Sequence, residues 1–290
     1  MTSSGVEDVY QESEVFFEKY LRLKVSASQT YRVTQTSGES LKEEELYEGQ
    51  SYEDSDWVYA MIDGSFILTR EGYKEVKVGR VFSERSVCLQ SCTATQERVR
   101  LSASEYCAHH GSNHTFKPKM ESLLSKIAPD KLVFITDGCP WIGQWMSEKY
   151  PQATQILDYY HAIEKLSEGT KSILKPANWL EQQKEYLLEG RVNLVIEQIK
   201  ELKRLPEAQK EQLINYYQNN AYRMNYNQYR DNGYYIGSGA IEAAHRTLIQ
   251  ERMKRSGQRW GQCTDPLIKL RVAFKSKKEH LIEKLFKKSA

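Results

Sequence analysis

Apolar positions follow two different patterns along the chain. Between residues 57 and 158, short apolar runs alternate with amphipathic segments, which is typical of an α/β domain. The runs predict strands at 57–66, 73–82, 98–107, 131–136 and 154–158, and helices at 117–127 and 141–149. From 171 to 231 no strand pattern remains, and helices are predicted at 179–188, at 192–205 and after Pro206.

The first 56 residues read as helical and acidic. Helical periodicity runs over 8–22, and Ser26 is placed to cap a second short helix that Gly38 would stop. Two helices joined by a tight turn are compatible with a helix-turn-helix, although the acidic surroundings would repel phosphate. The helix that begins after Ser26 would expose Gln29, Arg32 and Gln35. Residues 39–56 read as an acidic and polar linker.

The predicted elements after residue 56 run strand, strand, strand, helix, strand, helix, strand, helix. This order is the outline of a ribonuclease H-like domain, an α/β fold with a mixed sheet. An all-helical insertion then precedes a helix introduced by Gly237-Ser238-Gly239. The sequence therefore predicts four parts: a helical and acidic region with a possible helix-turn-helix remnant at 1–56, the ribonuclease H-like core at 57–170, the helical insertion at 171–231, and the final helix with a basic tail at 232–290.

Two of the predicted strands are each expected to end in Asp-Gly. Asp63 follows one apolar run and Asp137 follows another. If the strands are parallel neighbours, both carboxylates lie at one edge of the sheet, where α/β proteins place their chemistry. The alternative is that both pairs are ordinary turns, for which Asp-Gly is common.

A third carboxylate, Glu242, lies in the first turns of the predicted helix after residue 239, with Arg246 four residues later on the same face. Carboxylate oxygens suit Mg²⁺ or Mn²⁺ better than zinc. Two such ions about 4 Å apart can activate the attacking oxygen and stabilise the leaving oxygen in phosphoryl transfer. We therefore expect Asp63, Asp137 and Glu242 to hold two metal ions and to be catalytic, with Asp63 best placed to bridge them.

The net charge of +2 hides a strong asymmetry. Residues 1–57 contain 13 acidic and 5 basic side chains, whereas residues 243–290 contain 13 basic and 4 acidic ones. A basic end indicates a polyanionic partner such as DNA, or else a solvated helix face. The predicted phosphate contacts are Arg246, Arg252, Lys254, Arg255 and Arg259, with Trp260 packing or stacking beside them.

Composition places the protein in a reducing compartment. Its five cysteines have no regular framework spacing, and the sequence shows neither a basic-then-apolar leader nor a membrane-length apolar run. We expect a cytoplasmic, non-membrane protein. The tyrosines between 216 and 235 would either stack on unpaired bases or pack helices together.

Five motifs in this order resemble the catalytic part of insertion-sequence DDE transposases of the Kra type, relatives of the Mutator-like transposases. They are Met61-Ile62-Asp63-Gly64, Ile135-Thr136-Asp137-Gly138, Leu157-Asp158-Tyr159-Tyr160-His161, Gly237-Ser238-Gly239-Ala240-Ile241-Glu242, and Arg252-Met253-Lys254-Arg255-Ser256-Gly257-Gln258-Arg259-Trp260. The resemblance implies a ribonuclease H-like fold, metal-dependent cleavage at element ends and strand transfer into target DNA. It also implies a bacterial, nucleoid-associated protein that forms a homo-oligomer on DNA.

The resemblance has further implications for single residues and for length. It implies that His161 contacts DNA near the metals; the alternative is a helix-start histidine bonded to a backbone group. Transposases of this type usually have a longer N-terminal DNA-binding portion, so the chain is expected to be a fragment or one part of a split reading frame.

The sequence has four other interpretations in addition to a transposase, and one of them fails on chemistry. A zinc site would use loosely spaced ligands, for which the candidates are Cys88, Cys92, Cys107, His109, His110 and His114. A haloacid-dehalogenase-type phosphatase fails, because its nucleophilic Asp would stand where this chain has Met61. A ribonuclease H-like nuclease or resolvase, and a non-catalytic DNA-binding remnant, are the functional alternatives.

Overall fold

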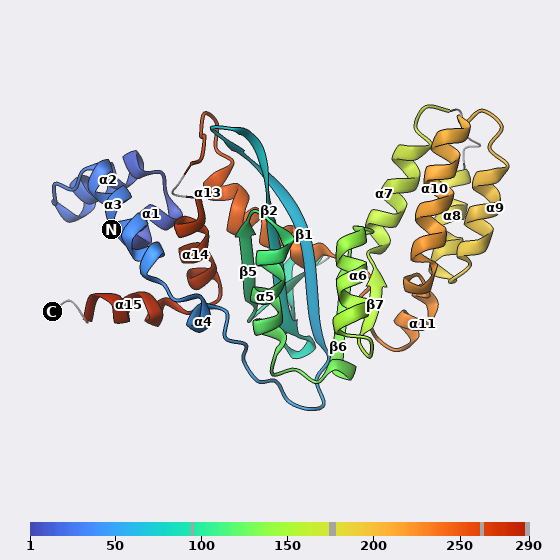
Figure 1. Ribbon diagram of the computed structural model, residues 1–290, viewed down its shortest axis with the longest axis horizontal. Coiled ribbons are helices and arrows are strands. Elements are labelled where there is room, and N and C mark those ends of the chain that lie inside the picture. The colour runs from blue at the N-terminus through green and yellow to red at the C-terminus, as the bar shows by residue number, and fades with distance from the viewer. Residues whose placement is uncertain (94–95, 174–177, 262–263, 288–290) are drawn as a thin grey trace. The chain divides into compact units, whose positions relative to one another are not determined.

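The computed structural model describes residues 1–93, 96–173, 178–261 and 264–287 (Figure 1). The chain divides into two compact units: Met1–Ala128 together with Ala240–Ala290, and Pro129–Gly239. The described strands form a mixed five-stranded sheet in the order β5-β2-β1-β6-β7, and β3 and β4 form a separate two-stranded ribbon. The predicted α/β class is confirmed.

The first unit is built on a long hairpin. Strand β1 (Val58–Thr69) pairs antiparallel with β2 (Gly72–Ser83) along its whole length. The prediction that β1 ends at Asp63 is wrong, because the strand continues for six residues beyond it. The segment after Asp63 keeps an alternation of buried and exposed side chains, so it continues to pair with β2 up to a two-residue turn. Asp63 is therefore a mid-strand residue and not a turn residue.

The region predicted as one strand at 98–107 contains the end of strand β4 and the start of strand β5. Strand β3 (Val87–Thr93) pairs with β4 (Gln96–Leu101), and β5 (Glu105–His110) pairs with β2. The Ser-Ala-Ser sequence at 102–104 separates β4 from β5, and the Ser102 N–H donates to the Ser86 carbonyl at 2.8 Å, where the β3–β4 ribbon leaves. Polar, weakly strand-forming residues thus end one strand before the next begins.

The helices of the first unit confirm the predicted N-terminal pair. Ser26 caps α3 in a reciprocal capping box with Gln29. Gly38 does not stop α3, which continues to Ser40; a Cβ at Gly38 would lie 2.2 Å from the Pro266 carbonyl oxygen, so this glycine permits close helix packing. The unit's described helices are α1 (Thr2–Glu7), α2 (Tyr10–Leu21), α3 (Ala27–Ser40), α4 (Glu43–Leu46), α5 (Asn113–Leu124), α12 (Gly239–Ala244), a π-helical turn (His245–Gln250), α13 (Glu251–Met253), α14 (Thr264–Lys275) and α15 (Glu279–Lys287).

The predicted acidic linker is part of the folded unit. It contains α4, and its apolar side chains Leu41, Leu46 and Tyr47 are buried. The Tyr47 hydroxyl donates to the Ala108 carbonyl of β5 at 3.1 Å. Three apolar anchors therefore fix a segment whose average composition is that of a linker.

The second unit carries a parallel strand pair and a helical block. Strands β6 (Leu132–Thr136) and β7 (Thr154–Leu157) pair in parallel, as βαβ connections require. Tyr217, Tyr226 and Tyr229 are buried and donate to backbone carbonyls, so these three tyrosines pack helices, as one of the two predicted alternatives states. The described helices are α6 (Pro140–Lys149), α7 (Tyr159–Gly169), α8 (Trp179–Leu188), α9 (Val192–Lys200), α10 (Glu207–Asn220) and α11 (Tyr226–Asp231).

No helix in the described ranges is both long enough and apolar enough to cross a bilayer.

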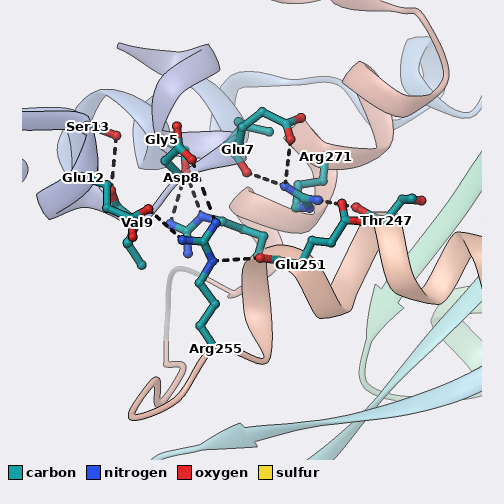
Figure 2. A network of polar contacts seen from close by, with 12 residues as sticks. Gly5, Glu7, Asp8, Val9, Glu12, Ser13, Thr247, Glu251, Arg255 and Arg271 are labelled. Atoms are coloured by element: carbon teal, nitrogen blue, oxygen red, sulfur yellow. Dashed lines mark hydrogen bonds and ion pairs between the residues drawn. The ribbon is translucent and has the colours of Figure 1, made fainter. Parts of the chain in front are cut away.

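A buried guanidinium joins the two ends of the first unit. Arg271 of α14 is fully buried and donates to the carbonyl oxygens of Thr247 and Leu248 in the π-helical turn and to that of Val6 in α1 (Figure 2). Burial lowers the pKa of Arg271 to about 10. A charged group remains in this apolar setting because three carbonyls replace the water that it loses.

Replacing Arg271 with Met should destabilise the protein by about 3 kcal/mol or more, because each buried carbonyl left without its donor costs about 1–3 kcal/mol. The measurement is urea denaturation. The matched control is Lys275→Met on the same helix, whose partner Glu7 is half-exposed, and its loss should stay within about 1 kcal/mol. A loss below about 1 kcal/mol for Arg271→Met would show that the guanidinium does not hold the unit together.

Candidate active site

Asp63 lies on β1, where its carboxylate has one hydrogen bond to the backbone and a histidine close by. Oδ1 accepts from the Gly64 N–H at 2.7 Å, and Oδ2 lies 3.3 Å from Nε2 of His245. The Asp63 side chain is 23% exposed, whereas that of His245 is 5% exposed. The carboxylate is therefore oriented from the protein side and still accessible from outside.

The helix that carries Glu242 is tied to the same hairpin. Arg80 of β2 donates from Nη1 to the Ala240 carbonyl oxygen at 2.7 Å, and from Nε to Ser104 Oγ at 3.0 Å. Its guanidinium also lies 5.1 Å from the centre of the Tyr106 ring. Arg80 is buried, and burial lowers its pKa. The start of α12 is thus fixed against β2 by a desolvated cation.

The two ties lie on either side of Glu242 along the chain. Ala240 precedes it by two residues, and His245 follows it by three. Glu242 itself is exposed, whereas Ile241 and Ala244 of α12 are buried. Through His245, the structure therefore places Asp63 beside the helical segment that follows Glu242. Sequence reasoning missed both ties; an Arg inside the apolar β2 run and a His one turn after Glu242 were the available signals.

Asp137 belongs to the second unit and directly follows β6. Its Oδ1 accepts from the Cys139 N–H at 3.0 Å. Tyr216 of α10 packs over Gly138, where a Cβ would lie 2.4 Å from Tyr216 Cε2. Burial raises the pKa of Tyr216, and the nearby Asp137 charge raises it further. The helical insertion thus contributes a tyrosine beside Asp137, which no local sequence signal indicated.

His161 is part of a buried polar cluster in the second unit. Its Nδ1 contacts Oδ2 of Asp158, and the Ser238 hydroxyl donates to the same oxygen. Oδ1 of Asp158 accepts from the Tyr160 N–H at 3.0 Å and so caps α7. Asp158 is fully buried, and the His161 side chain is 32% exposed. The partner of Nδ1 is a carboxylate and not the backbone group of the alternative prediction, which leaves the contact of His161 with DNA a prediction.

The predicted phosphate contacts separate by exposure. Arg246, Lys254 and Arg259 are exposed. Lys254 is within electrostatic reach of Asp63: burial lowers the pKa of Lys254, and the Asp63 charge partly opposes this. Three of the predicted residues therefore stand in solvent, one of them beside the candidate site.

The other three predicted contacts are engaged inside the first unit. Arg252 is buried and donates to the Gly5 carbonyl oxygen at 3.2 Å, and Trp260 is buried with its ring 5.2 Å from the Arg252 guanidinium. Arg255 pairs with Glu12 at 2.7 Å and has Asp8 at 3.9 Å (Figure 2). Arg252 is therefore buried against α1 instead of exposed to phosphate as predicted. Trp260 packs beside it, which is one of its two predicted roles, and Arg255 is partly neutralised.

The donor chemistry fits a magnesium-type ion, although the described residues form no ready-made metal group. Among them, no group of three or more His, Cys, Asp or Glu side chains is arranged to hold a metal. In the first unit, however, Asp63 and Glu242 provide carboxylate oxygens, and the His245 imidazole is buried beside Asp63. Among the described residues the predicted zinc ligands form no metal group, with Cys107 buried in β5 and Cys88 exposed. The side chain of Cys92 lies outside the described residues.

Replacing Asp158 with Ala should destabilise the protein by about 3 kcal/mol, because the change removes a helix cap and leaves the buried Ser238 hydroxyl and the partly exposed His161 ring without their acceptor. Thermal and urea unfolding measure the loss. Glu164→Ala on the exposed face of the same helix is the control and should change stability by no more than about 0.5 kcal/mol. Equal losses for the two variants would contradict a structural role for the Asp158 cluster.

Comparison with known proteins assigns no family to this site. No protein-family model matches the chain, and no curated protein matches it. The site is therefore interpreted from its own chemistry.

Proposed function

We propose that the protein is a DDE-type DNA transposase with a ribonuclease H-like catalytic core. The observation that carries the proposal is the 3.3 Å approach of Asp63 to His245, on the helical segment that bears Glu242. This contact places the Asp63 carboxylate beside the helical segment on which Glu242 lies, which supports the proposal. The mixed five-stranded sheet is compatible with such a core.

In the proposal, Asp63, Asp137 and Glu242 together hold two Mg²⁺ or Mn²⁺ ions. When bound, such ions activate the attacking oxygen and stabilise the leaving one in phosphoryl transfer. The proposal therefore requires the Asp137 carboxylate to meet the other two. Each aspartate is already oriented within its own unit by a backbone N–H, which lowers the cost of forming the site.

The exposed cations supply the grip on DNA. Arg246 follows Glu242 by one turn, and Lys254 lies within electrostatic reach of Asp63. Phosphates of an element end would be drawn to these groups and brought beside the carboxylates. In strand transfer the freed 3′-hydroxyl gives its proton to solvent and attacks a phosphodiester of the target. A new P–O bond forms, the target P–O3′ bond breaks, and the leaving 3′-oxygen takes a proton from solvent. We propose that the enzyme is a homo-oligomer when it joins ends to target.

Replacing Asp63 or Asp137 with Asn, or Glu242 with Gln, should reduce Mg²⁺-dependent cleavage of element-end DNA by about 10³-fold or more, the effect of losing several kcal/mol of charge stabilisation. Melting temperatures without metal should stay level or rise, because a like charge is removed. Glu164→Gln is the control for an exposed carboxylate. Full activity in any of the three variants would remove that residue from the site.

The same assay, with labelled ends and a plasmid target, separates the alternatives. Joined products are the expected result. Cleavage without joining under several metal conditions would favour the nuclease or resolvase. Tight DNA binding with neither activity would favour the non-catalytic remnant. Because the motifs resemble those of longer transposases, the assay is repeated with a DNA-binding domain fused before Met1.

Exposed and engaged cations should differ in their contribution to DNA binding. Arg259→Ala and Lys254→Ala should each lower the slope of log K against log salt by about 0.9, the value for one lost phosphate contact. Arg252→Met should leave the slope unchanged, since its guanidinium is buried against Gly5, and its cost should appear as lost stability. Binding isotherms at four salt concentrations measure this. Equal slopes for all three variants would place the DNA elsewhere on the protein.

A further inference from the structure

The imidazole of His245 is buried, and neither of its ring nitrogens makes a hydrogen bond among the described residues. The residue is 4% exposed. Nε2 lies 3.3 Å from Asp63 Oδ2, which is within ion-pair distance but outside hydrogen-bonding geometry. A buried polar group left unpartnered costs about 1–3 kcal/mol, so this arrangement needs a reason.

The backbone holds this imidazole in place from both sides. His245 begins the π-helical turn, a rare local geometry that often occurs at functional sites. Arg80 anchors Ala240 on one side of His245, and Arg271 takes the carbonyls of Thr247 and Leu248 on the other. The backbone is therefore anchored on both sides of His245, and the His245 ring lies 3.3 Å from the Asp63 carboxylate.

We propose that His245 is a positioning residue for Asp63, fixing Oδ2 so that the carboxylate presents its remaining lone pairs to a divalent metal ion. This inference rests on the proposed function, since it gives His245 a role in the metal site. The Gly64 N–H donates to Oδ1, the His245 imidazole lies beside Oδ2, and each carboxylate oxygen can accept more than one bond. A residue that fixes a metal-ligating carboxylate in this way raises metal affinity without touching the ion.

The experiment compares Mn²⁺ affinity, measured by electron paramagnetic resonance on the full chain, for four variants. His245→Ala removes the nitrogen, and His245→Gln returns an N–H donor at a similar reach. Leu248→Ala is the control for lost packing, because Leu248 is fully buried in the same π-helical turn. His280→Ala removes an exposed histidine.

Mn²⁺ binding should weaken by about 10–100-fold in His245→Ala, the usual cost of losing a residue that orients a metal ligand. His245→Gln should recover part of that loss, and the Leu248 and His280 variants should bind as the wild type does. Wild-type affinity in His245→Ala, or an equal loss in Leu248→Ala, would overturn the proposal.

A second readout needs no metal and no variant of His245. In ¹⁵N spectra of histidine rings from metal-free protein, Asp63→Asn should shift the His245 signals and leave those of His280 unchanged. No shift at His245 would overturn the proposal. If the wild type binds no Mn²⁺, the proposed function fails; the spectra then show whether the pairing exists, and a pairing without metal binding also refutes a role for His245 in a metal site.

Discussion

A catalytic carboxylate on a helix is only as well placed as the helix that carries it. The segment that bears Glu242 is short and irregular, changing from α to π geometry at His245. Short helices have little stability of their own, so this segment depends on tertiary contacts. Those contacts come from elements far apart in sequence and fix the segment along its whole length. They are Arg80 to Ala240, His245 beside Asp63, Arg271 to Thr247 and Leu248, and Arg252 to Gly5.

Part of the charge asymmetry along the chain is used in ion pairs within the first unit. The acidic N-terminal helices lie against the basic C-terminal segment, where Glu7 pairs with Lys275. Glu12 pairs with Arg255 in the same way (Figure 2). Arg252 and Arg271 donate hydrogen bonds to the backbone carbonyl oxygens of Gly5 and Val6. They therefore act as hydrogen-bond donors to neutral groups inside the fold. Net charge therefore overstates the surface offered to a polyanion: a run of arginines in sequence divides into cations that hold the fold and cations that face solvent.

The sequence predicted most elements and the position of Asp137 after a strand, because apolar periodicity and caps are local signals. The capping box at Ser26 and the strand before Asp137 are of this kind. The failures are non-local. Gly38 resembles a helix stop until Pro266 is seen against it, and β1 continues past Asp63 because β2 pairs with it. In the candidate site the carboxylates were visible in the sequence. Arg80 and His245 were not, since their roles exist only once distant segments meet.

The three candidate carboxylates differ in how firmly their side chains are oriented. Asp63 and Asp137 are each oriented by a backbone N–H close by in sequence, at 2.7 and 3.0 Å, so these carboxylates are held by rigid groups within their own units. Glu242 is exposed, has a longer side chain, and owes its place to the anchors of its helix. Side-chain entropy makes a long exposed carboxylate the most costly of the three to fix. A helix anchored on both sides of Glu242 limits that cost to the side chain itself. Arg80 and His245 therefore anchor the backbone on both sides of Glu242 within the first unit.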